Sequence, residues 1–456
     1  MIEKILANLD AEKENHVQRL FDILRIPSIS TDPDRKADVR KGADWVHRFF
    51  QDCGLTSEII ETPGHACVLA DTGPVNGAPT ILVYGHYDVQ PVGDESLWHS
   101  PAFEPTIRDG AIYARGAADD KGQALTHMLA VESWKRTAGA VPIRVKFMIE
   151  GEEEIGSPNL GEILRKHRDR LACDYVVLSD TPKFNADTPA ITYGTKGMIY
   201  KEIILYGPKQ NLHSGQYGGT ITNPGNVLAD IVSSLRDADN RVTIPGFYDD
   251  VLSLTADEKS IIAELPFDEE AYLGYTGSPA LDGEVGFSTI ERRWVRPTLD
   301  VNGMHGGFIG EGASTVIPAK VMAKVSMRIV PNQNPDAISH AFDEAVRAVC
   351  PATVRMEILT HAIAAPYVAP LDSPGMKSAA AAIESGFGVA PQFTREGGTL
   401  PILPLFRDVL GADSLMMGFC HPDCNAHGPD EFFGVDDFHA GIRSSAKFLH
   451  LLSQAG

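Results

Sequence analysis

The chain has 456 residues, of which 43% are hydrophobic and 22% are charged, as in an ordinary globular protein long enough for two domains. Its 40 Lys and Arg residues against 61 Asp and Glu residues give a formal net charge of −21, so we exclude nucleic acid as a primary partner and expect anionic membranes to be repelled. Six cysteines in so long a chain are no disulfide framework.

Residues 1–24 are charged and amphipathic, with apolar side chains near helical spacing. They lack the basic n-region and the apolar h-region of a secretion signal, and no apolar run of about 18 residues occurs anywhere in the sequence. We therefore expect a cytoplasmic protein that has no membrane as a partner.

Strand-like and helical segments alternate through residues 1–195. The segments rich in Val and Ile at 79–84, 143–149 and 174–178 are predicted strands, and 122–136 and 159–170 are predicted helices. Strands separated by helices favour an α/β sandwich with a mostly parallel sheet.

The pattern changes from about Lys196. The elements predicted from there are strands at 199–206, 295–302, 321–330 and 353–360 and helices at 226–236 and 336–349, with loops and helices over 240–292. This order is typical of an inserted βαββαβ unit. The α/β pattern resumes after residue 366, with a helix at 374–385, a strand at 414–418 and a helix at 435–452. We therefore predict a discontinuous domain, 1–195 and 366–456, interrupted by a second domain at 196–365.

Five side chains of the kinds that bind metals lie in the α/β part, mostly just after predicted strands, where open α/β sheets place their sites. They are His86, Asp119, Glu154, Asp180 and His427. Two imidazoles and three carboxylates suit zinc or manganese, with one carboxylate too many for a simple mononuclear site. A bridging carboxylate would give each of two metals three protein ligands and leave room for a water, which predicts a hydrolase.

Each of these residues also has a structural interpretation when it is taken alone. His86 and Asp88 can be a strand-end histidine and a turn aspartate, although residues two apart on an extended chain point the same way, so that Asp88 can orient the ring. Asp119 can cap a helix, Asp180 can close a turn, and His427 can be a surface histidine. Their joint occurrence at strand ends favours the metal site.

The acidic run Glu152-Glu153-Glu154 would normally be a solvated face. Here it follows a strand rich in Val and Ile and leads to Gly156, which places it at the mouth of a sheet. Adjacent carboxylates there can divide the work, one holding a metal while its neighbour takes a proton from a metal-bound water.

Cys420 and Cys424 flank His421 and Asp423, which raises the alternative of a structural zinc site. No second Cys/His pair has the usual zinc-finger spacing, so the sequence favours the other ligand set.

Several longer motifs resemble those of the co-catalytic zinc metallopeptidases, which include carnosine and Cys-Gly dipeptidases, carboxypeptidase G, aminoacylase and succinyl-diaminopimelate desuccinylase. The motifs lie at residues 26–30, 84–91, 98–103, 211–219, 315–318 and 394–399. The resemblance covers nearly the whole chain and is closest to the dipeptidase branch. It implies a zinc-peptidase-like three-layer α/β sandwich with an inserted βαββαβ lid or dimerisation domain, two divalent metal ions (zinc, with manganese as the alternative) and a homodimer.

The resemblance also implies roles for the metal ligands. Asp119 would bridge the two metals, with a cis peptide bond between Asp119 and Asp120. His86 and Asp180 would complete one metal site, and Glu154 and His427 the other.

By the same resemblance, Glu153 would be the general base, and Asp88 would support the first histidine ligand. His213, in a His-Ser-Gly segment, would polarise the scissile carbonyl in the active site of the partner subunit.

Five further residues would contact the substrate. Arg328 would grip its terminal carboxylate through two parallel hydrogen bonds, and Thr399, after Gly398, would assist from a loop. The dipeptidase pattern often has Ser where this chain has Thr399, so the extra methyl group could narrow the pocket. Thr315 and His361 are further candidates, although the spacing around His361 departs from the pattern by about one residue.

We therefore expect a di-metal hydrolase that cleaves dipeptides or short peptides with a free C-terminal carboxylate, by attack of a metal-bound hydroxide with Glu153 as general base. An N-acyl-amino-acid deacylase of the acetylornithine or succinyl-diaminopimelate type is the alternative on the same fold. A catalytically silent binding protein is the alternative of another class, and it would be expected to lack a ligand or the base.

Overall fold

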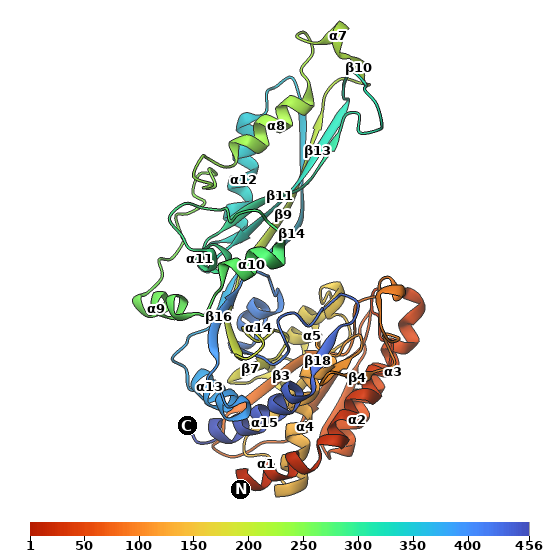
Figure 1. Cartoon of the computed structure of the whole chain (residues 1–456), viewed down its shortest axis with the longest axis vertical. Helices are drawn as coiled ribbons and strands as arrows, with labels where there is room; N and C mark the ends of the chain where they lie inside the picture. The colour runs from red at the N-terminus through yellow and green to blue at the C-terminus, as the bar shows by residue number, and fades with distance from the viewer. Residues whose placement is uncertain (456) are drawn as a thin grey trace. The chain divides into compact units, whose positions relative to one another are not determined.

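The computed structural model describes residues 1–455 and forms two compact units (Figure 1). Unit 1 comprises Met1–Tyr193, Ala369–Thr394 and the chain from Ile402 onward. Unit 2 comprises Gly194–Val368 together with Arg395–Pro401. This short segment lies within 366–456, the range predicted as the second part of the discontinuous domain. Among residues 1–455, no helix combines the length and the apolar character that a membrane crossing needs.

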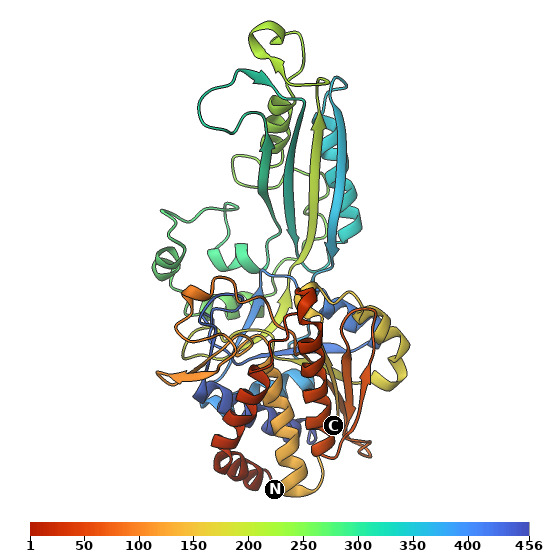
Figure 2. The same ribbon diagram turned by 90° about the vertical axis from the view of Figure 1, so that its right-hand side faces the viewer.

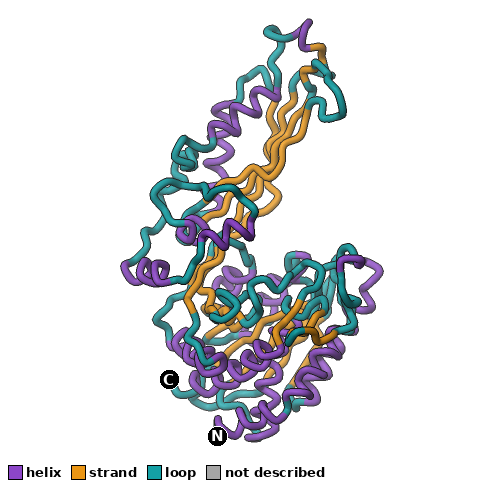
Figure 3. The backbone as a smooth tube through the Cα atoms, viewed as in Figure 1, coloured by secondary structure: helices purple, strands orange, loops and turns teal. Residues whose placement is uncertain are grey.

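A mixed β-sheet lies at the centre of unit 1, with helices around it (Figure 3). In spatial order its strands are β1 (Thr56–Ile60), β2 (Cys67–Asp71), β6 (Arg144–Glu150), β3 (Thr80–His86), β7 (Tyr175–Leu178), β17 (Asp413–Gly418) and β8 (Ala190–Thr195). The four strands from β6 to β17 run parallel, as predicted, whereas β1, β2 and β8 pair antiparallel with their neighbours. β15 (Tyr367–Val368) and β16 (Gln392–Glu396) also pair with β8.

Helices cover both faces of this sheet. Alternate side chains of a strand point to opposite faces, so neighbouring residues pack against helices on opposite sides. Tyr84 of β3 packs its ring against Phe406 of α14. Phe147 of β6 lies beside Val83 and so faces the other way, and its ring packs against Phe50 of α3. The helices of unit 1 are α1 (Ile2–Ala11), α2 (Lys13–Leu24), α3 (Lys36–Asp52), α4 (Lys121–Ala138), α5 (Leu160–Lys166), α6 (Arg168–Leu171), α13 (Pro374–Phe387), α14 (Ile402–Leu410) and α15 (Val435–Leu452).

Unit 2 contains a four-stranded antiparallel sheet whose long strands lie side by side (Figure 2). Its order is β11 (Thr298–Gly306), β13 (Lys320–Ile329), β9 (Gly197–Tyr206) and β14 (Arg355–Ala364). α8 (Pro224–Ser234) and α12 (Pro335–Val349) cover one face, where Phe342 packs among buried side chains such as Ile203 and Val325. The chain order β9, α8, β11, β13, α12, β14 is the predicted βαββαβ unit, and the α/β class is confirmed.

The remaining elements are short. Unit 1 also holds a small sheet of β4 (Thr106–Arg108), β5 (Ala111–Tyr113) and β18 (Phe432–Gly434). In unit 2, β10 (Leu212–His213) pairs with β12 (Val316–Ile317) and leads into α7 (Ser214–Tyr217). The stretch predicted as loops and helices contains α9 (Ala256–Glu264), α10 (Glu269–Thr276) and α11 (Thr289–Trp294).

Candidate metal centre

The carboxyl end of β3 places His86 in a buried and orienting environment. His86 is the last residue of β3, and both it and Asp88 are fully buried. The ring Nδ1 lies 3.1 Å from the Asp88 carbonyl oxygen and 3.4 Å from its carboxylate, so Nε2 is directed away from the strand. The Asp88 carboxylate also accepts the backbone N–H groups of Glu153 and Glu154 at 3.3 and 3.2 Å. Asp88 therefore orients a histidine and also the acidic turn after β6.

Asp119 lies before α4 and contacts histidines from distant parts of the chain. Its Oδ1 is 3.1 Å from Nε2 of His86, and its Oδ2 is 2.9 Å from Nε2 of His427. The peptide bond between Asp119 and Asp120 is cis. Asp120 is the N-cap residue of α4, but its side chain makes no capping hydrogen bond, so the helix-cap alternative does not describe this turn.

Two clusters of possible ligand atoms share Asp119. His86, Asp119 and Asp180 form one cluster, and Asp119, Glu154 and His427 form the other. Within each cluster the ligand atoms all lie within 4.8 Å of one another. The donor set of imidazole nitrogens and carboxylate oxygens fits zinc or manganese, and a carboxylate that belongs to both clusters is suited to bridge two neighbouring ions.

The electrostatics of these clusters also fit bound cations. Burial raises the pKa of Asp180 to about 7, and the charge of Asp119 acts in the same direction. Burial alone would raise the pKa of Asp119 as well, but hydrogen bonds from His427 and His86 outweigh it and hold that pKa well below its usual value. Hydrogen bonds that the protonated ring donates to Asp119 and Glu154 raise the pKa of His427 to about 10. Three carboxylates close together in a buried space repel one another when they are ionised, so nearby positive charge stabilises them.

Glu153 lies beside these clusters without belonging to either. It begins the short 3-10 turn Glu153–Ile155 that follows β6. Burial raises the pKa of Glu153 to about 8, because the charges of Asp180 and Asp119 add to the burial and outweigh the opposing effect of His86. A carboxyl group with a pKa raised toward neutrality is suited to accept and return a proton.

Glu431 is a residue of this centre that the sequence analysis did not identify. It is fully buried, and its carboxylate accepts backbone N–H groups from Gly116, Ala118 and Asp119 at 3.0, 2.9 and 3.1 Å. The guanidinium of Arg115 donates to it at 2.7 Å. Glu431 follows the His427 loop, so one carboxylate ties that loop to the loop of Asp119. The signal available in the sequence was an acidic residue shortly after a candidate ligand histidine.

Four of the predicted residues of unit 2 form two local pairs. His213 is exposed, and it pairs in register with Val316, next to Thr315, whose carbonyl oxygen accepts the N–H of Ser214 at 2.9 Å. Arg328 of β13 donates from Nη1 to the Thr399 hydroxyl at 2.7 Å.

The two other predicted residues of unit 2 have their own neighbours. The carbonyl oxygen of Gly398 accepts the N–H of Lys196 at 3.0 Å. His361 lies 2.7 Å from the Glu202 carboxylate, and its ring packs near that of Tyr200.

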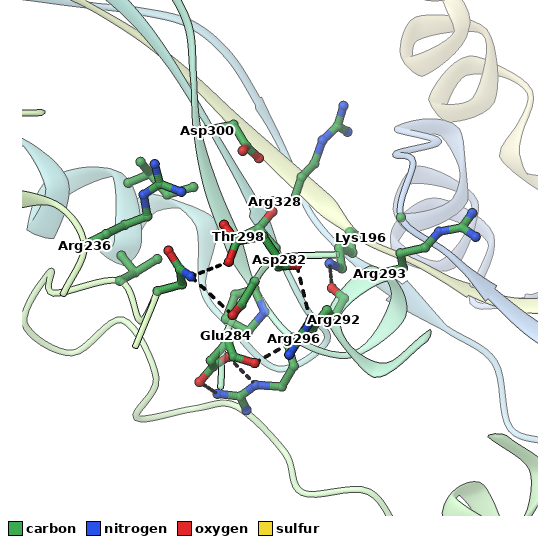
Figure 4. Close-up of a pocket in the computed structure, with 16 residues that line it drawn as sticks. Lys196, Arg236, Asp282, Glu284, Arg292, Arg293, Arg296, Thr298, Asp300 and Arg328 are labelled. Atoms are coloured by element: carbon green, nitrogen blue, oxygen red, sulfur yellow. Dashed lines mark hydrogen bonds and ion pairs between the residues drawn. The ribbon is translucent and has the colours of Figure 1, made fainter. Parts of the chain in front are cut away.

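A basic cavity of about 390 Å³ lies in unit 2 beside Arg328 (Figure 4). Its charged lining residues are Lys196, Arg236, Arg292, Arg293, Arg296, Arg328, Asp282, Glu284 and Asp300. Glu284 is engaged by two hydrogen bonds of 2.7 Å from Arg296, whereas Lys196 donates to the Arg292 carbonyl oxygen at 2.9 Å. Burial lowers the pKa of Lys196 to about 7, and the charge of Arg328 acts in the same direction. The cavity therefore favours an anionic ligand.

Comparison with known proteins agrees with this geometry. Residues 82–451 match the sequence model that describes peptidase family M20/M25/M40. The chain belongs to this family. It is 31% identical over 469 residues to the Cys-Gly metallodipeptidase dug1 of Schizosaccharomyces pombe, covering 99% of this chain and 98% of the relative. Human carnosine dipeptidase 1 superposes with a TM-score of 0.81 at 28% identity, over 99% of each chain. The M20 metallo-carboxypeptidase Sso-CP2 of Sulfolobus solfataricus gives 0.85 at 31% identity, over 96% of this chain and 99% of that one.

Membership of the M20/M25/M40 family makes the protein a metallopeptidase, an enzyme that hydrolyses peptide bonds with divalent metal ions. The prediction of the family and of its dipeptidase branch is confirmed, and the alternative of a catalytically silent protein is not favoured, because the relatives are enzymes. The alternative of an N-acyl-amino-acid deacylase is not favoured, because the relatives are metallodipeptidases.

Proposed function

We propose that the protein is a di-metal dipeptidase that cleaves dipeptides or short peptides with a free C-terminal carboxylate. The observation that carries this proposal is the sharing of Asp119 by two ligand clusters, with Glu153 beside them and in neither. Its relatives support the choice of substrate, since they include Cys-Gly and beta-Ala-His dipeptidases.

Asp119 together with His86, Asp180, Glu154 and His427 would hold the two ions, which we propose to be zinc. Bound zinc ions supply Lewis acidity, which activates water and stabilises negative charge on the carbonyl oxygen. The residues around them perform the proton transfers.

Glu153 takes the proton of the attacking water and returns it to the amine that leaves, so no covalent acyl intermediate forms. Its raised pKa supports both steps, because the group is basic enough to accept the proton and acidic enough to release it. Asp88 orients His86 through Nδ1.

In this proposal Arg328 binds the C-terminal carboxylate, assisted by Thr399 and Gly398. The contact between Arg328 and Thr399 and the basic cavity beside them support this role, since a guanidinium binds a carboxylate through two parallel hydrogen bonds. Thr315 and His361 are assigned to the same substrate-binding role on resemblance.

We also propose that the protein is a cytoplasmic homodimer in which His213 stabilises the developing oxyanion in the partner subunit. The exposure of His213 in unit 2 supports this: Nδ1 accepts the Gly215 N–H at 3.0 Å, and the exposed ring can still meet a ligand outside its own loop. Mixing His213→Ala chains with Glu153→Ala chains tests it. A shared site restores part of the activity in the heterodimer, whereas no recovery despite verified heterodimer formation contradicts it.

A hydrolysis panel tests the substrate class. We expect turnover of dipeptides with a free carboxylate, and at least tenfold lower kcat/KM for the same dipeptides amidated at the C-terminus, because the amide loses a charge-assisted hydrogen bond. Preference for N-acetyl or N-succinyl amino acids over every dipeptide would refute the proposal. Metal analysis of the purified protein identifies the ions.

A further inference from the structure

Cys420 and Cys424 form a pair of thiols close to the loop that carries His427. Their Sγ atoms are 3.9 Å apart, and the two residues are 4% and 5% exposed. The N–H of Cys424 donates to the carbonyl oxygen of His421 at 3.1 Å, so a tight turn brings the two cysteines together. The proposed reaction uses neither thiol.

Cys420 is connected to two of the ligand loops. Its Sγ lies 3.8 Å from the carbonyl oxygen of Thr181, the residue after Asp180. Its N–H donates to the Gln123 side-chain oxygen at 3.1 Å, and the amide nitrogen of the same Gln123 donates to the carbonyl of Ala118 at 3.0 Å. Cys420 is therefore held firmly against the segments that lead to Asp180 and Asp119.

Cys424 is connected to a third ligand loop, because it precedes Asn425-Ala426-His427. Asn425 and His427 both have left-handed backbone conformations, with φ of 56° and 63°. Such conformations persist in non-glycine residues only when their surroundings enforce them. A displacement of Cys424 therefore passes directly to the backbone that positions His427.

We propose that Cys420 and Cys424 are an oxidation site, and that their closure to a disulfide displaces His427 and weakens the metal cluster of Asp119, Glu154 and His427. A disulfide bond is about 2.05 Å long, so the sulfur atoms must approach by about 2 Å. Cys420 is held on several sides, so Cys424 and the loop after it make most of this movement. The effect on the metal rests on the proposed function, whereas the disulfide itself does not.

The chemistry needs an oxidant, which we take to be a small aliphatic disulfide such as oxidised glutathione. The Cys424 thiolate attacks one sulfur of this disulfide. A mixed disulfide forms between Cys424 and that sulfur, and the other sulfur leaves as a thiolate. Cys420 loses its proton to water, and its sulfur attacks the Cys424 sulfur and releases the second thiolate. Two cysteines are oxidised by two electrons, and one small disulfide is reduced to two thiols. The hydrogen-bond interaction with Cys420 lowers the pKa of the Cys424 thiol, which suits Cys424 as the attacking group.

The full-length, zinc-loaded protein tests the site. After incubation with oxidised glutathione and alkylation of free thiols, a protease that cleaves before Asp423 separates Cys420 and Cys424 onto different peptides. We expect these two peptides to stay joined until dithiothreitol is added. Both cysteines recovered as alkylated or glutathionylated peptides, with no joined product, would overturn the proposal.

Zinc affinity is the second readout. We expect oxidation to weaken the binding of one of the two ions by about 10- to 100-fold, reversibly with dithiothreitol, as competition with a zinc indicator measures. Cys424→Ser and Cys420→Ser should keep both ions and lose the response, while Cys350→Ser, which changes a cysteine of unit 2, should keep it. A joined peptide with unchanged zinc affinity overturns the coupling to His427. Untreated protein that binds no zinc refutes the proposed function instead, whatever the peptides show.

Discussion

The two units place their candidate functional groups in opposite environments. In unit 1 the candidates are largely buried at the ends of parallel strands and contact one another, as His86 and Asp119 do. In unit 2 they are more accessible: His213 is exposed, and Arg328 is half-buried with a neutral hydroxyl as its hydrogen-bond partner. Unit 1 thus holds a preorganised centre, whereas unit 2 offers more accessible groups that can bind a ligand.

The candidate groups of the two units also differ in the direction of their pKa shifts. Burial raises the pKa of Asp180 and Glu153 in unit 1 and lowers the pKa of Lys196 and Arg328 in unit 2. Burial disfavours the charged form of acidic and basic side chains alike. In each unit, a bound ligand of the opposite charge therefore stabilises the charged form. Cations suit unit 1, and a carboxylate suits unit 2.

The largest effect should come from Glu153→Gln in unit 1. The amide cannot accept the proton of the attacking water, so we expect kcat to fall by about 10²- to 10⁴-fold while both metal ions are retained. Glu152→Gln is the matched control, because the Glu152 carboxylate is engaged by the His65 N–H and the Asn159 amide. Steady-state kinetics and metal analysis check this. Equal losses in the two variants, or loss of the ions from Glu153→Gln, would contradict the role of Glu153 as a base.

Glu431→Gln should affect the same unit through its loops. The variant loses the charge that holds Arg115 and one acceptor for the loop of Asp119, so we expect about 10- to 100-fold weaker metal binding. Asp430→Asn is the control, because that neighbouring carboxylate pairs with His99 and Arg108 instead. Zinc titration of the metal-free proteins measures the difference. Unchanged affinity in Glu431→Gln would show that the two loops hold the ligands without it.

Arg328→Lys tests the recognition assigned to unit 2. A lysine keeps the charge but loses the paired hydrogen bonds. We therefore expect kcat/KM to fall roughly 30-fold, which corresponds to about 2 kcal/mol, mainly through a higher KM. Arg355→Lys is the matched control, because Arg355 stacks on Tyr206 in the same sheet. Kinetics with free and amidated dipeptides separate the outcomes. An equal loss on both substrates would mean that Arg328 does not bind the carboxylate.

The smallest effect concerns the stability of unit 1 in acid. Burial lowers the pKa of His16 and His439 from 6.5 to about 4, and their rings are 6.4 Å apart. The unfolded chain therefore binds more protons between about pH 6.5 and pH 4, so the stability of the folded state falls as the pH is lowered through this window.

Urea unfolding of the metal-free protein at pH 6.5 and pH 5 measures this slope. His16→Gln should reduce it, while His340→Gln, at an exposed position of unit 2, should leave it unchanged. An unchanged slope in His16→Gln would contradict burial of a neutral imidazole at this position.

Local sequence patterns predicted the elements well wherever a single periodicity governed the segment. The predicted helix 435–452 is α15, and the predicted strand 174–178 is β7 within one residue. The predicted strand 295–302 was displaced, and β11 begins at Thr298. The reason is that α11 occupies the preceding residues, with a capping box between Ser288 and Glu291 that hydrophobic alternation does not report.

The amino-acid sequence by itself determined which side chains were available for metal chemistry and which of them follow strands, because both depend on residue type and local periodicity. Only the tertiary structure decided that one carboxylate, Asp119, faces two histidines, that Glu431 ties two ligand loops together, and that Cys420 meets Cys424 against them. It also decided the shifted pKa of Glu153. Distances between segments hundreds of residues apart, and the loss of water around a charge, arise only when the whole chain packs.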